Sequence, residues 1–286
     1  MKRARPNPDS RSIVGSSRDL EVLESIAWAG FLSTRQVQAL HFPSRRTTQR
    51  RLRALLDHHL VRATMQGEAL QRDNVYTITP AGVELLQETR GLDNAKPHRV
   101  PRLQKLRHGL AIRDVFVAIL LGERAGTLRI ADVRFEEDLT RVPEFVALRI
   151  VPDALLELGG QDLPAVAVEV DLGTETIATV QSKIVSYARL LAAGVHMGSG
   201  RRVCLLVVAR TEARRLVWSR LLAEARLDGG SAVVRIDDPN EIVDRACSLA
   251  VFARPVLTER MGPAREAGEF RPVFQPDIAA FRPLSG

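Results

Sequence analysis

The sequence has few features that would cross-link it or place it in a membrane. Its two cysteines, Cys204 and Cys247, lie in separate apolar segments without metal-site spacing, which predicts small core residues. The longest apolar runs, such as residues 115–121, are far shorter than the roughly 20 residues that span a bilayer. The basic start, residues 1–5, lacks the apolar core of a signal peptide. We therefore expect a cytoplasmic protein with no membrane partner.

Lysine is also scarce, and its last occurrence is informative. Only four of the 41 basic residues are lysines, and Lys183 is the only one after Lys105. In a chain so rich in arginine, an arginine would be the ordinary choice at this position. A compact, rotatable ammonium can hold a water or a single phosphate oxygen beside a metal, which a flat guanidinium does less well. Lys183 therefore marks a candidate site.

Size and charge predict two domains and an anionic partner. A chain of 286 residues with 45% hydrophobic content can bury a sizeable core and is long enough for about two domains. The net charge of +7 is uneven, because residues 1–100 hold 16 basic and 10 acidic residues, which is +6. The N-terminal third is therefore the predicted nucleic-acid surface.

Three helices are expected before residue 60. Apolar residues recur at helical spacing over residues 18–29, a short helix is expected over residues 35–41, and a third helix begins after Ser44. One face of the third helix is a buried stripe of leucines: Leu52, Leu55, Leu56 and Leu60. The opposite face, with the residue at its start, forms a polar row that is suited to phosphates and bases: Arg45, Arg46, Gln49, Arg50 and Arg53.

A two-stranded wing follows the third helix. Residues 61–65 and 74–78 have strand composition around a polar turn, and Arg72 near the tip joins the predicted DNA-binding set. A further helix follows, and the order of elements predicts a winged helix-turn-helix over residues 15–90 that binds double-stranded DNA. Residues 91–101 have linker composition. The alternative is a small helical domain with a solvated arginine face.

The rest of the chain has an α/β pattern, and the fold class expected for the whole is α+β with an α/β part. After a helix over residues 103–121, short runs rich in Val, Ile and Leu alternate with helices, which predicts a mixed sheet over residues 102–253. The expected strands are residues 128–135, 148–158, 165–171, 203–209 and 232–236, and the expected helices are residues 174–193, 211–225 and 241–252. Residues 254–286 are rich in proline and predict an extended tail.

Acidic residues converge within that sheet. Because side chains alternate along a strand, Glu169 and Asp171 lie on one face of the strand over residues 165–171. A hairpin to the preceding strand would set Asp153 opposite Glu169, about 5 Å away, so that the two could share one divalent cation. Lys183, on the following helix, could reach back over these carboxylates.

These residues carry a family resemblance. Pro152-Asp153, Glu169-Val170-Asp171 and Lys183-Ile184-Val185-Ser186-Tyr187 resemble the motifs of the PD-(D/E)xK nuclease superfamily. The resemblance implies that Asp153 and Glu169 bind Mg²⁺ and that Lys183 positions the attacking water, with Asp171 as a further catalytic candidate. Together with the upstream winged helix, the string resembles the replication-relaxation family of plasmids and other mobile elements, over about residues 15–250. The expected function is DNA binding in replication or DNA relaxation, with a Mg²⁺-dependent endonuclease centre.

Several alternatives stay open at this point. The superfamily's usual third motif is Glu-x-Lys on one strand, whereas here Asp171 holds that place and the lysine lies on the helix. Asp171 could instead cap the next helix, and Lys183 could form a stabilising ion pair with Glu169 or Asp171. The protein would then be a winged-helix transcriptional regulator whose nuclease-like domain is a catalytically silent scaffold for sensing or dimerisation. RNA processing is less favoured because the N-terminal unit offers no aromatic stacking platform. A second copy of the chain is a further candidate partner.

Overall fold

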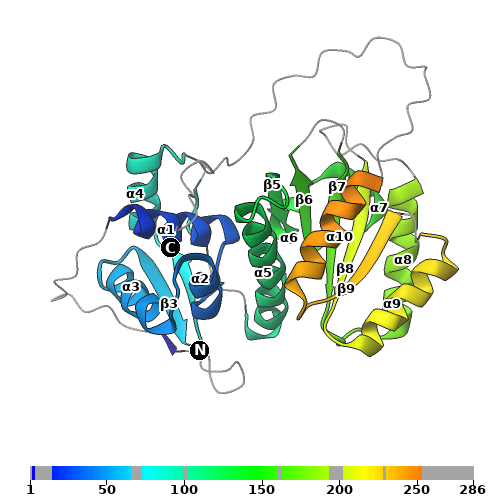
Figure 1. The fold of residues 1–286 in the computed structure, drawn as a ribbon, viewed down its shortest axis with the longest axis horizontal. Helices are drawn as coiled ribbons and strands as arrows, with labels where there is room; N and C mark the ends of the chain where they lie inside the picture. The colour runs from blue at the N-terminus through cyan, green and yellow to red at the C-terminus, as the bar shows by residue number, and fades with distance from the viewer. Residues whose placement is uncertain are drawn as a thin grey trace, which may run out of the picture. The chain divides into compact units, whose positions relative to one another are not determined.

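The structure is a computed structural model (Figure 1). It describes residues 2–3, 15–65, 73–93, 95–98, 102–159, 163–192, 202–227 and 230–252. The described chain forms two compact units that divide between Val117 and Ala118, inside the helix α5, Leu103–Arg124. Each unit has a sheet of its own.

The first unit contains every helix and strand that the sequence predicts for it. Its elements are β1 (Lys2–Arg3), α1 (Ser17–Ala29), β2 (Leu32–Ser33), α2 (Thr34–His41), α3 (Arg45–Asp57), β3 (Val61–Met65), β4 (Asn74–Ile78), α4 (Pro80–Arg90) and the first part of α5. The strands form an antiparallel sheet in the order β1-β3-β4-β2. The expected hairpin of β3 and β4 is confirmed, whereas Arg72 lies outside the described residues.

Helix caps explain where these helices begin. Ser16 and Asp19 form a reciprocal capping box at α1, and Ser33 forms one with Gln36 at α2. The Ser44 hydroxyl accepts a hydrogen bond from the Thr47 amide at α3. Each cap satisfies amide groups that a helix leaves unpaired at its start, so the local sequence fixes these boundaries.

Buried polar contacts hold the first unit together around its apolar core. The four leucines of the predicted stripe are at most 8% exposed. Asp19 on α1 is buried and accepts hydrogen bonds from the Arg51 guanidinium, at 3.0 Å for Nε, which fixes α3 against α1. On α5, the buried Arg113 donates through Nε to the Ala29 carbonyl at 2.9 Å. These contacts hold α3 and the first part of α5 against α1.

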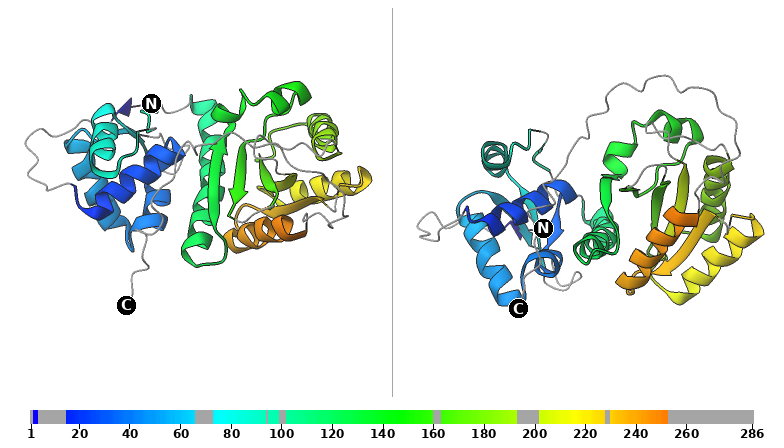
Figure 2. Two further views of the ribbon diagram at one scale, coloured as in Figure 1. Left: turned by 90° about the horizontal axis from the view of Figure 1, so that it is seen from above. Right: turned by 45° about the horizontal axis from the view of Figure 1, so that its top comes forward.

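The second unit contains the predicted mixed sheet. Its elements after α5 are β5 (Ile130–Phe135), α6 (Glu136–Leu139), α7 (Pro143–Leu148), β6 (Ala154–Leu158), β7 (Ala165–Asp171), α8 (Ile177–Ala192), β8 (Val203–Ala209), α9 (Glu212–Glu224), β9 (Ser231–Arg235) and α10 (Pro239–Phe252). The strand order is β5-β6-β7-β8-β9, antiparallel up to β7 and parallel beyond it. Helices α8 and α9 cover one face and α10 the other (Figure 2). All residues of β7 and β8 are buried, as expected for strands covered on both faces.

The strand expected over residues 148–158 is wrong in its first half. Helix α7 runs to Leu148, and β6 begins only at Ala154. Between them Arg149 takes a left-handed conformation with φ 52°, and Pro152 has no amide to donate to a ladder. The short helices α6 and α7 were not predicted. Asp153 therefore immediately precedes its strand.

Candidate active site and nucleic-acid interface

Strands β6 and β7 bring Asp153 and Glu169 together. Ala154 pairs with Val168, so the antiparallel register, extended by one residue, sets Asp153 opposite Glu169. The Asp153 carboxylate accepts a hydrogen bond from the Val170 amide at 2.7 Å. The backbone carbonyl of Asp153 accepts one from the Glu136 amide at 3.0 Å. Both acidic residues are buried, at 8% and 2% exposure. The hairpin expected from the sequence thus creates a buried pair of carboxylates.

Helix α8 places two donors on Glu169. The Lys183 ammonium lies 2.5 Å from Glu169 Oε1, and the Tyr187 hydroxyl donates to Glu169 Oε2 at 2.7 Å. Lys183 also lies 2.7 Å from Oε1 of Glu175, in the segment between β7 and α8. The sequence predicted the reach of Lys183 to the acids, but it gave neither Tyr187 nor Glu175 a contact with Glu169 or Lys183. The spacing of Lys183 and Tyr187, one helical turn apart, is the signal that could have placed both on one carboxylate.

Burial and like charge shape the ionisation of this cluster. Burial, followed by repulsion from Asp153, raises the pKa of Glu169 to about 7, although Lys183 and Tyr187 act in the opposite direction. Burial alone would lower the pKa of Lys183, but the Glu169 and Glu175 carboxylates outweigh it and raise that pKa above its ordinary value. Burial and the Glu169 charge raise the pKa of Tyr187 well above its ordinary value, so its hydroxyl remains a donor. The cluster is therefore one ammonium among three carboxylates.

Asp171 lies on the same face of β7 but has different partners. Its Oδ2 accepts hydrogen bonds from Arg214 Nε at 2.8 Å and from the indole Nε1 of Trp218 at 2.6 Å, both on α9. Its Oδ1 accepts the Gly173 amide at 2.6 Å. Asp171 does not cap α8, because the Thr176 hydroxyl accepts the Thr179 amide there and the helix begins at Ile177, later than predicted. The structure thus joins Asp153, Glu169 and Lys183 in one cluster, whereas the Asp171 side chain is hydrogen-bonded to residues of α9.

The raised pKa of Glu169 predicts a pH dependence of stability. Its folded-state pKa, about 7, exceeds the ordinary value of 4.5, so the unfolded chain releases this proton first. The stability contribution is complete below pH 4.5 and is lost as pH rises to about 7, by roughly 3 kcal/mol. We expect Glu169→Gln to gain stability relative to the wild type between pH 5 and 8, as measured by urea unfolding. A difference that stays constant with pH would contradict this assignment.

Two of these carboxylates suit a magnesium ion. Among the described residues, no group of three or more His, Cys, Asp or Glu side chains is placed to hold a metal. Mg²⁺, however, is commonly held by one or two carboxylates, with waters and phosphates completing its coordination. Asp153 and Glu169 supply two, and a divalent cation would relieve the repulsion that raises the Glu169 pKa. The donor set therefore fits Mg²⁺ but leaves most of its coordination to solvent and substrate.

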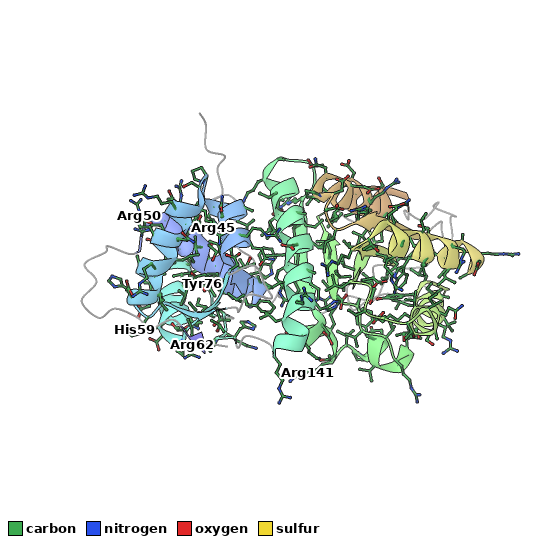
Figure 3. The ribbon with its side chains drawn as sticks, turned by 90° about the horizontal axis from the view of Figure 1, so that it is seen from below. Arg45, Arg50, His59, Arg62, Tyr76 and Arg141 are labelled. Carbon is green, nitrogen blue, oxygen red and sulfur yellow. The ribbon has the colours of Figure 1, made fainter. Side chains whose placement is uncertain are left out.

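A second feature, the outer face of α3, carries the predicted DNA-binding residues. Arg45, Arg46, Gln49, Arg50 and Arg53 are all exposed. Figure 3 shows Arg50 extending from α3 into solvent. Arg45 pairs with Asp73 at 3.2 Å and Arg53 with Asp57 at 2.9 Å, whereas Arg46 and Arg50 make no ion pair within the described part of the chain. Two guanidinium groups are thus available to an external anion.

Comparison with known proteins identifies the family. The model of the replication-relaxation family matches residues 23–202, more than half of the chain. The chain belongs to this family, as its motifs predicted, and the membership suggests a role in replication or relaxation. Searches of curated proteins and of solved structures gave no match. Within the described residues, no helix is both long and apolar enough to cross a bilayer.

Proposed function

We propose that this protein binds duplex DNA of a plasmid or another mobile element through α3 and acts in its replication or relaxation. The observation that carries the proposal is the exposed row on α3, in which Arg46 and Arg50 have no acidic partner among the described residues. Unpaired arginines on one helical face are suited to the phosphates and base edges of a major groove. Family membership supports the same role.

The topology of the first unit supports a winged helix-turn-helix. Its order is helix, short strand, two helices and a hairpin, and the short strand β2 pairs with β4. In that fold the second helix of the turn enters the major groove and the hairpin forms the wing. In our proposal α3 is the recognition helix. Gln49 suits adenine and the arginines suit guanine or phosphate.

The binding proposal predicts a salt-dependent loss of affinity in a double variant. We expect Arg46→Ala with Arg50→Ala to weaken binding to a short duplex about 10- to 100-fold and to reduce the salt slope by about one for each phosphate that the arginines no longer neutralise. Affinity would be measured by fluorescence anisotropy at several salt concentrations. The matched control is Arg220→Ala with Arg245→Ala, which removes two exposed arginines from α9 and α10. If both double variants bind like the wild type, α3 is not the recognition helix.

We further propose that the second unit is a PD-(D/E)xK-like nuclease centre. Asp153 and Glu169 would hold Mg²⁺, which when bound supplies charge neutralisation and an activated water. Tyr187 and Lys183 fix both oxygens of Glu169, so this carboxylate has one orientation. In this proposal the partly exposed Lys183 ammonium would donate to a phosphate oxygen and stabilise the negative charge that develops on it.

The test of the centre is cleavage of supercoiled plasmid by the full chain. We propose that the wild type nicks plasmid with Mg²⁺ and that EDTA prevents it. The competing function is a regulator with a silent nuclease-like scaffold. One observation favours this silent scaffold: both carboxylate oxygens of Glu169 already accept from Lys183 and Tyr187, as in a structural ion pair. A chain that cuts no plasmid with Mg²⁺ or Mn²⁺, yet binds duplex DNA, would establish that function instead.

A further inference from the structure

Lys183 is shared between an inner and an outer carboxylate. The side chain of Glu169 is 3% exposed, that of Lys183 27% and that of Glu175 31%. The ammonium therefore has the buried Glu169 on one side and the solvent-accessible Glu175 on the other, at 2.5 Å and 2.7 Å. An anion arriving from solvent would approach Lys183 on the side that Glu175 now occupies.

The backbone on both sides of Glu175 is anchored. The Gly173 amide is hydrogen-bonded to Asp171, and the Thr176 hydroxyl caps α8 through the Thr179 amide. Within the described part of the chain, the ion pair with Lys183 is the one polar contact of the Glu175 side chain, and both side chains of this pair reach solvent, at 31% and 27% exposure. The carboxylate can therefore leave Lys183 by side-chain rotation without refolding the segment.

The Glu175 carboxylate occupies a position on Lys183 that a phosphate oxygen could also occupy. The ammonium of Lys183 is in contact with two carboxylates, those of Glu169 and Glu175, so its positive charge is already engaged in the free protein. A carboxylate and a phosphodiester both present oxygen acceptors to an ammonium, so only one of them can occupy this side of Lys183.

We propose that the outer side of Lys183 is the binding position for a phosphodiester group and that the Glu175 carboxylate is an internal competitor for it. This inference rests on the proposed nuclease function and specifies where its substrate phosphate binds. Glu175 holds Lys183 in place in the free protein, and DNA must displace it. Glu175 thereby lowers the affinity of this site for anions.

The test uses a ligand too small to engage α3. We would titrate the full chain with the dinucleotide d(TpT) in EDTA and follow binding by NMR. Glu175→Gln keeps the shape of the side chain and removes its charge, and we expect it to bind d(TpT) about three- to tenfold more tightly than the wild type. Thymidine, which lacks the phosphate, should show no such gain.

Two further variants locate the effect. Adding Lys183→Gln to Glu175→Gln should abolish the gain, because the ammonium is the group that is released. Glu212→Gln is the matched control, since it also removes an exposed carboxylate from an ion pair, with Arg215, in the same unit. Its affinity for d(TpT) should stay within about twofold of the wild type, because Arg215 is not part of the cluster.

The outcomes separate this inference from the nuclease proposal. Equal or weaker d(TpT) binding by Glu175→Gln, in a chain whose wild type nicks plasmid, overturns the competitor role alone. A gain that survives Lys183→Gln, or that Glu212→Gln reproduces, also overturns it. A gain that depends on Lys183, in a chain that never nicks plasmid, supports the phosphodiester site and overturns the nuclease function.

Discussion

Asp153→Ala is expected to abolish plasmid nicking, with a loss of at least about a thousandfold, while affinity for duplex DNA stays almost unchanged. The variant removes one of the two proposed Mg²⁺ ligands, whereas the proposed DNA-binding residues lie on α3 in the other unit. The nicking rate and the anisotropy of a bound duplex would be measured on the same preparation. Asp138→Ala, which removes an exposed carboxylate from the nearby helix α6, is the control.

Lys183→Arg sharpens this expectation. It keeps the positive charge but replaces a compact ammonium with a larger planar group between Glu169 and Glu175. We expect nicking to fall with the fold intact. Undiminished nicking by Asp153→Ala or by Lys183→Arg would contradict the roles proposed for these residues. If the wild type never nicks and Lys183→Ala lowers the Tm by several degrees, the ion pair is structural.

Asp171→Ala is expected to destabilise the second unit by about 3–5 kcal/mol, or about 10 °C in Tm. The change leaves Arg214 and the indole N–H of Trp218 without their buried acceptor. Asp171→Asn should have a smaller effect, because an amide oxygen can still accept from Trp218. Thermal unfolding followed by circular dichroism measures both variants.

The control for Asp171 is Glu212→Ala, whose carboxylate is paired with Arg215 at the surface of α9. Its Tm should equal that of the wild type. An Asp171→Ala protein with the wild-type Tm but no nicking activity would instead support the catalytic role that the sequence predicted for Asp171. The two results therefore distinguish a structural carboxylate from a catalytic one.

The sequence predicted local structure well where local chemistry determines it. Ser44 before an amphipathic run defined α3, and the composition of residues 61–65 and 74–78 defined the hairpin. Alternation along β7 correctly placed Glu169 and Asp171 on one face, because the period of a strand is fixed by its backbone. The pairing of Asp153 with Glu169 followed from the hairpin alone.

The sequence could not assign partners that depend on helix placement. Arg214 and Trp218 lie more than 40 residues after Asp171, and only the packing of α9 on the sheet brings them to its carboxylate. Glu175 reaches Lys183 because Gly173 and Thr176 fix the segment between β7 and α8, a geometry that no periodicity encodes. The break before β6 required tertiary context as well, since Ile150 and Val151 have strand composition yet follow a helix.

The hydrogen bond from the Val170 amide to the Asp153 carboxylate couples a backbone group to the proposed metal site. This amide belongs to a fully buried strand and donates directly to a carboxylate that is proposed to hold Mg²⁺. Its NMR resonance is therefore an internal indicator, since cation binding at Asp153 weakens the hydrogen-bond acceptor and shifts the signal. Cation binding at Asp153 and Glu169 can thus be followed through one backbone nucleus, and the measurement requires no substrate turnover.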